Sequence, residues 1–427
     1  MRAYAALIVR GAVIASIIAS TCLGTVWSIR QARYLAAMDA GDAAKATRIW
    51  AANSIGWQAL ARSEVSSAPL KAQRSALVAV SDAPEDWRSW GVLAEIQADA
   101  GNLVGARISM SHVAEIDRGY EAHWRYANLL LLMGDAPGFW EQSAQALAVG
   151  QDPDIRSTLS QCWQVANGEP GRITAAVQRA QDLTKHPKQA FMLSFEWLNF
   201  LLGDGVVAPA GPLWQSVAEQ NLPESGLREL RTRVGERYVE ALARSGQNER
   251  ALDVWRDGVR RSIFDPNLGP SAENAVANAC FCAPFESGPL DWHLCPNCEV
   301  EVRAETKGPR STTCRLVIAF HGHEEGDQEL ARQTLLLMPN VRYALTVAWD
   351  KVGMESDAAL LMVVAMADGR RLTAVAVPNQ QSGDAVAVFT TPPIASSYRL
   401  EIDSQRPQGQ MPPRGTVWLN RLSVRAL

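Results

Sequence analysis

Residues 238–259 read YVEALARSGQNERALDVWRDGV and decide the character of the first half of the chain. Apolar residues recur at spacings of three and four on both sides of Gly246, as they do on one face of an α-helix. Glycine is favoured where a helix ends, because it adopts a positive φ without steric cost. The stretch therefore predicts two amphipathic helices joined by a short turn at Gly246.

The same pattern recurs, which predicts an internal repeat. In three places an alanine follows a glycine by five residues and a large apolar residue follows it by nine: Gly41–Ala46–Trp50, Gly101–Ala106–Met110 and Gly246–Ala251–Trp255. The small alanine lets the second helix of each hairpin pack closely against the first. Gly101 and Gly134 stand 33 residues apart, close to the period of the tetratricopeptide repeat, which the pattern resembles.

This resemblance implies a solenoid of helical hairpins over residues 30–268, because one hairpin alone cannot cover its apolar face. It also implies a protein partner, since such solenoids often bind a peptide or a helix. The sequence departs from the family pattern in two places: Phe139 replaces alanine after Gly134, and VVAPAGPLW interrupts the period after Gly203. No residue of this half has the character of a catalytic group.

The start of the chain predicts a membrane anchor. The uncharged run Gly11–Trp27 follows Arg10, and at about 1.5 Å per residue it spans roughly 26 Å, near the thickness of a hydrocarbon core. A cleaved signal peptide is the alternative, although no A-x-A cleavage site follows the run. We expect residues 1–29 to be a single-pass anchor in a bacterial inner membrane, with the N-terminus in the cytoplasm and the bulk of the chain in the periplasm.

The size and charge of the chain exclude one class of partner. The 427 residues are enough for two or three domains with cores of their own. The formal net charge is −4. Nucleic-acid binding depends on clustered Lys and Arg, so we expect no nucleic-acid partner.

The pattern changes after FDPNLGPSAEN, residues 264–274. Nine short apolar runs follow, separated by Gly, Pro, Asn and Asp: CEVEVRAE, TCRLVIAF, RQTLLLM, RYALTVAWD, AALLMVVAMA, RLTAVAV, DAVAVFT, SYRLEIDS and TVWLNRLSV. Regular short strands of this kind predict an antiparallel β-sandwich or jelly roll over residues 285–427, joined to the helical part by a linker at 269–284. The fold class expected for the whole chain is multidomain α + β.

The last 140 residues or so resemble the jelly-roll modules found among carbohydrate-binding and galactose-binding-like domains. The resemblance rests on LDWHL, on LVIAFHG followed by QTLLLMPNVRYALTVAW, and on the closing VWLNRLSV, where Asn420 replaces the usual aspartate. The combined architecture resembles bacterial envelope proteins with an anchor, helical repeats and a jelly-roll tail, some of them associated with exopolysaccharide export. That resemblance implies a binding or scaffolding role.

Five cysteines near the start of the sandwich are candidates for disulfide bonds: Cys280, Cys282, Cys295, Cys298 and Cys314. A four-thiolate zinc site and free buried thiols are the alternatives. A single residue separates the first two cysteines, whereas a zinc knuckle needs two or more. Thiols of an exported domain oxidise, so we expect disulfides and no metal. The pairing stays open, because spacing alone does not determine it.

Aromatic and polar residues near the expected loops are candidates for glycan binding. A sugar ring stacks its C–H face on an aromatic ring, and its hydroxyls bind nearby polar side chains. Trp292 and His293 lie together near a loop, and Trp349 ends an apolar strand. We select these three residues, and expect Trp418, between Val417 and Leu419, to be a core residue.

Catalytic motifs are absent from the sequence. It contains no G-x-S-x-G elbow, P-loop or H-E-x-x-H motif. HGHEEGDQE, residues 321–329, is best interpreted as a polar loop. The carboxylates Glu299, Glu301, Glu401 and Asp403 could serve a glycosidase only if two of them converged. We expect no catalytic residues, no cofactor and no enzymatic activity.

The sequence therefore predicts a non-catalytic envelope protein, a scaffold or binding protein for cell-envelope or exopolysaccharide assembly. The solenoid would bind a protein partner, and the jelly roll would bind glycan or protein. Two alternatives remain: a purely structural interaction module without glycan binding, and a divergent glycan-active hydrolase.

Overall fold

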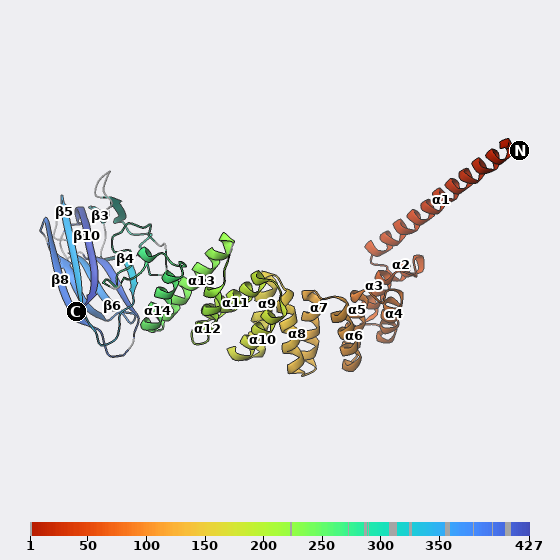
Figure 1. Ribbon diagram of the computed structural model, residues 1–427, viewed down its shortest axis with the longest axis horizontal. Coiled ribbons are helices and arrows are strands. Elements are labelled where there is room, and N and C mark those ends of the chain that lie inside the picture. The colour runs from red at the N-terminus through yellow and green to blue at the C-terminus, as the bar shows by residue number, and fades with distance from the viewer. Residues whose placement is uncertain are drawn as a thin grey trace. The chain divides into compact units, whose positions relative to one another are not determined.

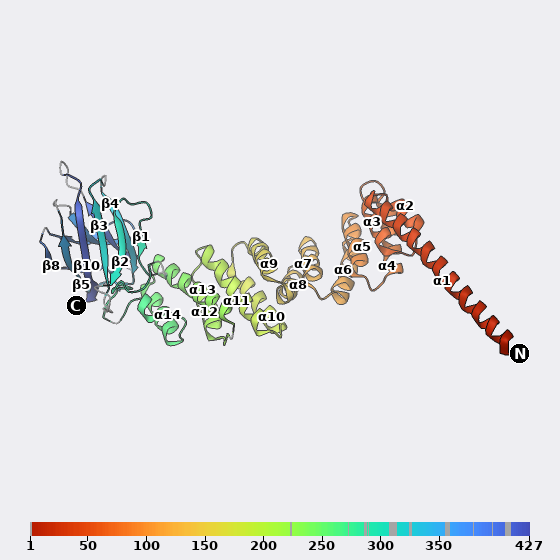
Figure 2. The same cartoon turned by 90° about the horizontal axis from the view of Figure 1, so that it is seen from above.

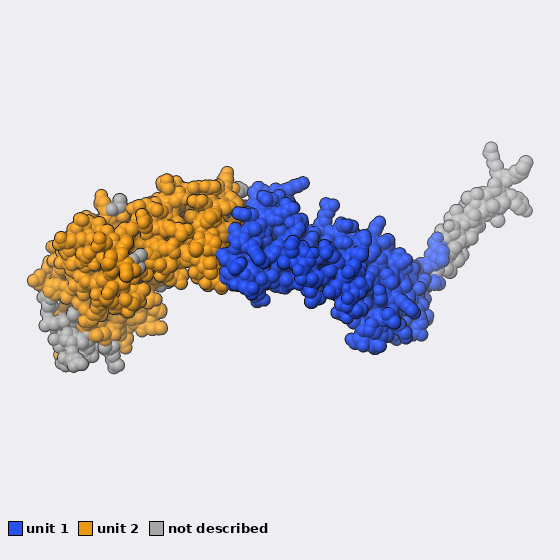
Figure 3. All heavy atoms as spheres, turned by 90° about the horizontal axis from the view of Figure 1, so that it is seen from below, with its two compact units in different colours: residues 1–193 blue, residues 194–427 orange. Residues whose placement is uncertain are grey.

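The computed structural model describes residues 2–427, with the exception of residues 223, 272, 286–287, 289, 307–313, 324–326, 355–358, 379, 395 and 406–410. For residues 2–19, 22 and 359 it describes the backbone but not the side chains. The chain divides into two compact units, residues 1–193 and 194–427 (Figure 3). The first unit is helical, and the second contains helices followed by two antiparallel sheets (Figure 1). The predicted α + β multidomain class is confirmed.

The first unit contains, among its described residues, helices α1 (Arg2–Asp39), α2 (Ala43–Ile49), α3 (Ser54–Glu64), α4 (Pro69–Asp82), α5 (Trp87–Asp99), α6 (Leu103–Ile116), α7 (Tyr120–Leu132), α8 (Ala136–Val149), α9 (Asp152–Val165) and α10 (Pro170–Leu183). Helix α11 (Pro187–Gly203) includes the boundary between the units. The second unit continues with α12 (Ala210–Glu219), α13 (Ser225–Arg244), α14 (Asn248–Arg260) and the 3-10 helix η1 (Pro266–Leu268).

The predicted turn glycines separate paired helices. Gly101, Gly134 and Gly246 have φ of 77°, 75° and 75°, the left-handed backbone that favours glycine. After the first two glycines, Asn102 and Asp135 cap the next helix by accepting a backbone hydrogen bond through a side-chain oxygen. The pairs α5–α6, α7–α8 and α13–α14 pack as helical hairpins (Figure 2).

The small positions of the repeat are buried as predicted, and so are two of its three large positions, whereas Trp50 is partly exposed. Ala106 and Ala251 have no exposed surface, and Met110 and Trp255 are almost fully buried. Phe139, which replaces the alanine of the third hairpin, is also fully buried. The α7–α8 hairpin therefore accommodates a large ring where the other hairpins have a methyl group.

An aromatic stack joins the last helices of the second unit. The ring of Phe264 lies parallel to those of Trp255 and Trp214, with centroids 4.8 and 5.9 Å away. A Cβ at Gly258 would lie 2.1 Å from Phe264, and a Cβ at Gly235 would lie 2.4 Å from Trp214. Glycine is needed at both positions because the rings occupy the space that a side chain would take.

The predicted membrane span belongs to α1. Most of its side chains lie outside the described residues, which include the side chains of α1 only from Ser20 onward, without Cys22. Within the described part of the chain, no helix combines the length and apolar character that crossing a membrane requires. The anchor therefore stays a prediction.

Ten strands are present in the described residues: β1 (His293–Leu294), β2 (Glu301–Thr306), β3 (Cys314–His321), β4 (Gln328–Leu335), β5 (Arg342–Val352), β6 (Ala359–Met366), β7 (Arg371–Val377), β8 (Ser382–Thr390), β9 (Tyr398–Gln405) and β10 (Arg414–Ala426). The nine predicted runs correspond to β2 through β10. The sequence analysis missed the short β1.

The strands form two five-stranded sheets that pack face to face. The order in the first sheet is β1-β4-β9-β6-β7, and the order in the second sheet is β2-β3-β10-β5-β8, with every pair antiparallel. Without β1 and β2 at the edges, the orders β4-β9-β6-β7 and β3-β10-β5-β8 are those of an eight-stranded jelly roll. Alternate residues of each strand face the other sheet and form one apolar core.

Part of the segment expected to be a linker packs on this core. The backbone N–H of Ala275 donates to the carbonyl of Val424 on β10. On β4 the Gln333 side chain both accepts from and donates to the backbone of Ala277, at 3.1 and 2.8 Å. Val276 and Phe281 are buried in the core itself. Residues 275–281 thus pack on both sheets, while the domain boundaries at 268 and 284 stay a prediction.

Candidate functional site

Two of the three residues selected for glycan binding are core residues. Trp292 is 1% exposed and packs on Phe281, with ring centroids 5.9 Å apart. Trp349 is 2% exposed and lies against Gly383, where a Cβ would be 2.9 Å from its ring. A buried ring has no face that a sugar can reach, so the predicted role is wrong for both tryptophans in this structure. The burial follows from their inward positions in the sandwich.

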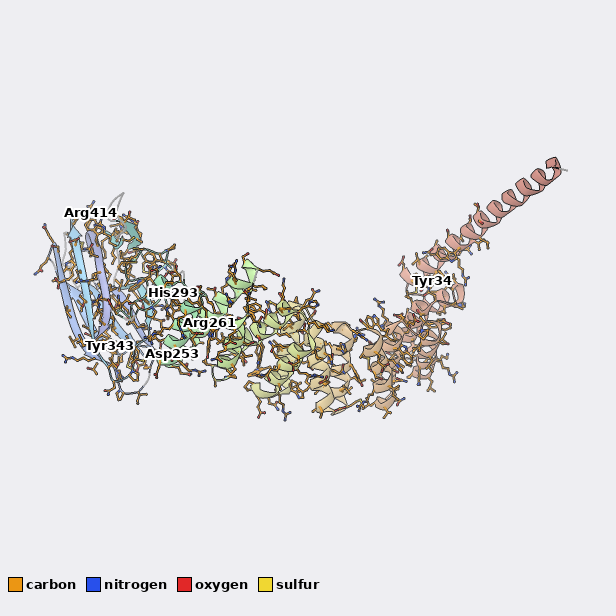
Figure 4. All side chains as sticks on the ribbon, viewed as in Figure 1. Tyr34, Asp253, Arg261, His293, Tyr343 and Arg414 are labelled. Carbon is orange, nitrogen blue, oxygen red and sulfur yellow. A yellow bond between two sulfur atoms is a disulfide. The ribbon has the colours of Figure 1, made fainter. Side chains whose placement is uncertain are left out.

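His293 differs from its neighbour because it points outward. It lies on the edge strand β1 opposite Arg332 of β4 and is exposed (Figure 4). A glycan contact at this histidine stays a prediction.

The outward-facing tryptophan of the sandwich is Trp418. Its neighbours Val417 and Leu419 are buried in the core, and successive side chains of a strand point to opposite faces. Trp418 is therefore on the outer face of the second sheet, where it is partly exposed. This position corrects the expectation that Trp418 is a core residue.

Four polar residues surround this ring, and together with it form the Trp418 cluster: Glu305, Arg315, Asp350, Trp418 and Asn420. The guanidinium carbon of Arg315 lies 4.5 Å from the ring centroid, a cation–π distance. Glu305 accepts hydrogen bonds from the indole Nε1 at 3.3 Å and from Arg315 at 3.2 Å. These contacts fix the indole and the guanidinium in one orientation.

A β-bulge places the fifth member of the cluster. The register of β10 against β5 shifts between Leu419 and Arg421, which leaves Asn420 without a partner in the ladder. Bulges of this kind redirect a side chain. Asn420 donates from Nδ2 to Asp350 at 2.8 Å and thereby lies on the same outer face as Trp418, which is paired with Asp350.

Two polar atoms of the cluster have unused hydrogen-bonding capacity. Arg315 Nε and Asn420 Oδ1 are buried, and neither has a hydrogen-bond partner among the described residues. Leaving such a group unsatisfied costs about 1–3 kcal/mol. One atom is a donor and the other an acceptor, so a hydroxyl group, which does both, complements either of them.

The outer face of the first sheet has a second polar cluster. Glu401 and Asp403 are two residues apart on β9, and Glu329 of β4 is opposite Asp403. Arg371 lies 3.5 Å from Asp403, Arg332 lies 3.6 Å from Glu329, and Arg399 pairs with Glu401. Burial raises the pKa of Asp403 to about 6, and the nearby charge of Glu401 also raises it.

The structure thus brings together two of the four carboxylates considered for catalysis. Glu301 lies on β2 in the other sheet and pairs with Arg303 at 3.0 Å, and Glu299 precedes that strand. In the polar loop 321–329, residues 324–326 lie outside the described residues, and His321 Nε2 lies 4.0 Å from a carboxylate oxygen of Glu301. No group of three metal-binding side chains occurs where the chain is described.

The cysteines form one disulfide and one thiol cluster. Cys295 and Cys298 are bonded, with Cα atoms 5.5 Å apart, so the prediction of a disulfide is confirmed for this pair. The Cys282 thiol donates a hydrogen bond to the carbonyl oxygen of Cys280 at 3.3 Å. Burial raises the pKa of this thiol, and the neighbouring Cys314 side chain raises it further. Cys280, Cys282 and Cys314 form no disulfide within the described part of this structure, so the prediction of disulfides is not confirmed for these three.

A cavity of about 330 Å³ lies in the second unit between α14 and the sandwich. Asp253 of α14 and Tyr343 of β5 line it from opposite sides (Figure 4). The Tyr343 hydroxyl accepts a hydrogen bond from the backbone of Met338 at 2.9 Å, and Asn248 donates from its side chain to the carbonyls of Leu337 and Ser396. The two hydrogen bonds of Asn248 attach the N-terminal end of α14 to the sandwich.

No protein-family model and no curated protein matches this chain.

Solved structures are similar to parts of this chain. A carbohydrate-binding module entitled "CBM4 structure and function" is 10% identical, with 36% of this chain and 99% of that chain covered and a TM-score of 0.28. The enzymatically active domain of bacteriophage CBA120 tailspike protein 4 is 14% identical, with 36% and 21% covered and a TM-score of 0.27. Pseudomonas aeruginosa pilF is 12% identical, with 48% and 90% covered and a TM-score of 0.25. Identities and TM-scores this low give no information on function.

Proposed function

We propose that the chain is a non-catalytic binding protein of the bacterial cell envelope that acts in envelope or exopolysaccharide assembly. Its helical repeats bind a protein partner, and its β-sandwich binds a glycan through the Trp418 cluster. The observation that supports the glycan part is the arrangement around Trp418: an outward-facing indole beside an unsatisfied donor and an unsatisfied acceptor.

This arrangement matches the chemistry of a sugar. The C–H face of a pyranose packs on an aromatic ring, and two neighbouring hydroxyls accept from and donate to polar side chains. Arg315 Nε supplies the donor and Asn420 Oδ1 the acceptor. Because Glu305 fixes the ring and the guanidinium before a ligand arrives, binding loses little side-chain freedom.

The described end of α1 supports a membrane anchor. Leu23, Val26 and Trp27 are exposed on this helix although all three are apolar. Trp27 lies 5.7 Å from the ring of Trp50, over which Arg30 is also placed. Tryptophan is favoured at a membrane interface. We place the preceding residues in the inner membrane and the bulk of the chain in the periplasm, where disulfides such as Cys295–Cys298 persist.

Two observations favour other functions. Burial of Trp292 and Trp349 favours a purely structural interaction module, since it removes two of the aromatic rings available to a sugar. The pairing of Glu401 with Asp403, whose raised pKa lies near neutrality, favours a divergent glycan-active hydrolase. Release of reducing ends from a polysaccharide, abolished in Asp403→Asn, would establish the hydrolase.

Glycan binding can be measured as retardation of the detergent-solubilised full chain in native gels that contain bacterial exopolysaccharides. We expect Trp418→Ala and Asn420→Ala each to weaken the affinity for glycan, derived from the retardation, by about tenfold, as loss of a central contact does. Val388→Ser, at an exposed position on the edge strand β8 of the same sheet, serves as the control and should change nothing. Absence of retardation by every glycan would favour the structural module.

A further inference from the structure

A groove of about 490 Å³ lies between α8 and α10 in the first unit. The two helices are the second members of successive hairpins and pack side by side (Figure 1). Small and apolar side chains line most of the groove: Ala136, Pro137 and Trp140 on α8, and Ala175 and Ala176 on α10. The groove is therefore narrow and largely apolar.

Among the residues that the structure describes, some charged side chains of the groove have an ion-pair partner and one does not. At one position Arg179 of α10 binds Glu141 of α8 through two hydrogen bonds, at 3.2 and 3.3 Å. This ion pair lowers the pKa of Glu141, so both charges are used. Arg172 also lines the groove, but within the described residues it makes no ion pair. The uncompensated charge of the groove is positive.

Trp140 adds an unsatisfied donor to this positive charge. Its indole Nε1 is buried and has no hydrogen-bond partner in the described part of the chain. A buried indole N–H normally has an acceptor. A carboxylate is the acceptor that would both complete this hydrogen bond and neutralise Arg172.

We propose that this groove binds an acidic segment of a protein partner, in which an apolar side chain packs on Trp140 and a neighbouring Asp or Glu binds Arg172 and the Trp140 N–H. The inference rests on the protein-binding part of the proposed function and locates it on two helices. It is independent of the glycan part, which depends on the sandwich.

The test uses the detergent-solubilised full chain and a fluorescein-labelled octapeptide of alternating Asp and Leu, with an Asn and Leu octapeptide for comparison. Fluorescence anisotropy measures the affinity. We expect the acidic peptide to bind more tightly than the amide peptide. Arg172→Gln should weaken its binding about threefold, as for a partly exposed ion pair, and Trp140→Phe about tenfold, as for a hydrogen bond to a charged group.

Two further variants keep the test informative if Trp140→Phe alters the fold. Ala175→Glu places a negative charge at an exposed position of the groove and should abolish binding of the acidic peptide. Arg74→Gln, an exposed position on α4, removes an equal charge elsewhere and should have no effect. Equal affinity for both peptides, or equal losses in Arg74→Gln and Arg172→Gln, would overturn the inference. Retardation of the same groove variants in native gels that contain exopolysaccharide tests the glycan part separately. It therefore distinguishes failure of the groove proposal from failure of the glycan proposal.

Discussion

At the scale of single residues, the alternation of a strand is more informative than the size of a side chain. Val417 and Leu419 are both apolar, and the period of two places them on one face and Trp418 on the other. The sequence therefore contained the signal for an outward-facing Trp418. It contained no comparable signal for Trp292, whose burial depends on contact with Phe281, eleven residues earlier.

The same scale gives a prediction about pH. The pKa of Asp403 is raised from 3.8 to about 6 in the folded chain, chiefly by burial and next by Glu401. Well below pH 3.8 the carboxyl is neutral in both the folded and the unfolded chain. Between pH 3.8 and about 6 the unfolded chain releases this proton while the folded chain keeps it, so stability is lost over this range and the loss is complete above pH 6. Asp403→Asn should therefore raise the free energy of unfolding at pH 7 by up to about 3 kcal/mol.

Urea denaturation at pH 7 and pH 4 measures this difference. The gain should largely disappear at pH 4, which lies close to the unfolded pKa of 3.8, so that little of the stability difference has developed there. Arg371 and Arg399 lower the pKa of Asp403, and the value of about 6 already includes their attraction, so a gain of zero at pH 7 would contradict the raised pKa. An equal gain at both pH values would contradict the electrostatic explanation.

At the scale of elements, local chemistry predicted the hairpins well. Gly101 and Gly134 have the backbone that their positions required, because a helix end is determined by a few neighbouring residues. The bulge at Asn420 and the packing of residues 275–281 on both sheets could not be predicted in this way. They depend on strands that are distant in sequence, such as β4 and β5.

The thiol cluster yields a prediction at this scale, because it lies where the segment before the sandwich meets β3. The Cys314 side chain raises the pKa of the Cys282 thiol, an effect that requires the two sulfurs to lie near one another. Oxidised glutathione should therefore convert them to a disulfide, releasing two glutathione thiols. The bond would close a loop of about thirty residues and stabilise the oxidised chain by about 3 to 4 kcal/mol.

Mass spectrometry of non-reduced peptides, together with denaturation, checks this outcome. Cys314→Ser should remove both the cross-link and the added stability, whereas Cys280→Ser should preserve them. A Cys280–Cys282 bond, or zinc that copurifies with the three thiols, would contradict the assignment.

At the scale of the whole molecule, composition and periodicity predicted a helical region followed by an antiparallel sandwich, since both are repeated many times along the chain. The proposed ligand surfaces were not predicted, because each consists of residues from several elements. The Trp418 cluster combines β2, β3, β5 and β10. The groove at Trp140 combines two helices from different hairpins.

The proposed membrane attachment concerns the whole chain, and the exposed apolar residues of α1 make it testable. Leu23 and Val26 are 71% and 65% exposed, so burying them in lipid costs no packing within the protein. A charged residue there would have to be desolvated. We expect the full chain to remain with membranes after alkaline extraction, and the double variant Leu23→Glu, Val26→Glu to be released. Ala36→Glu, exposed farther along the same helix, should stay bound. Release of the unmodified chain would contradict the anchor, and protection of the bulk of the chain from protease added to spheroplasts would contradict its orientation.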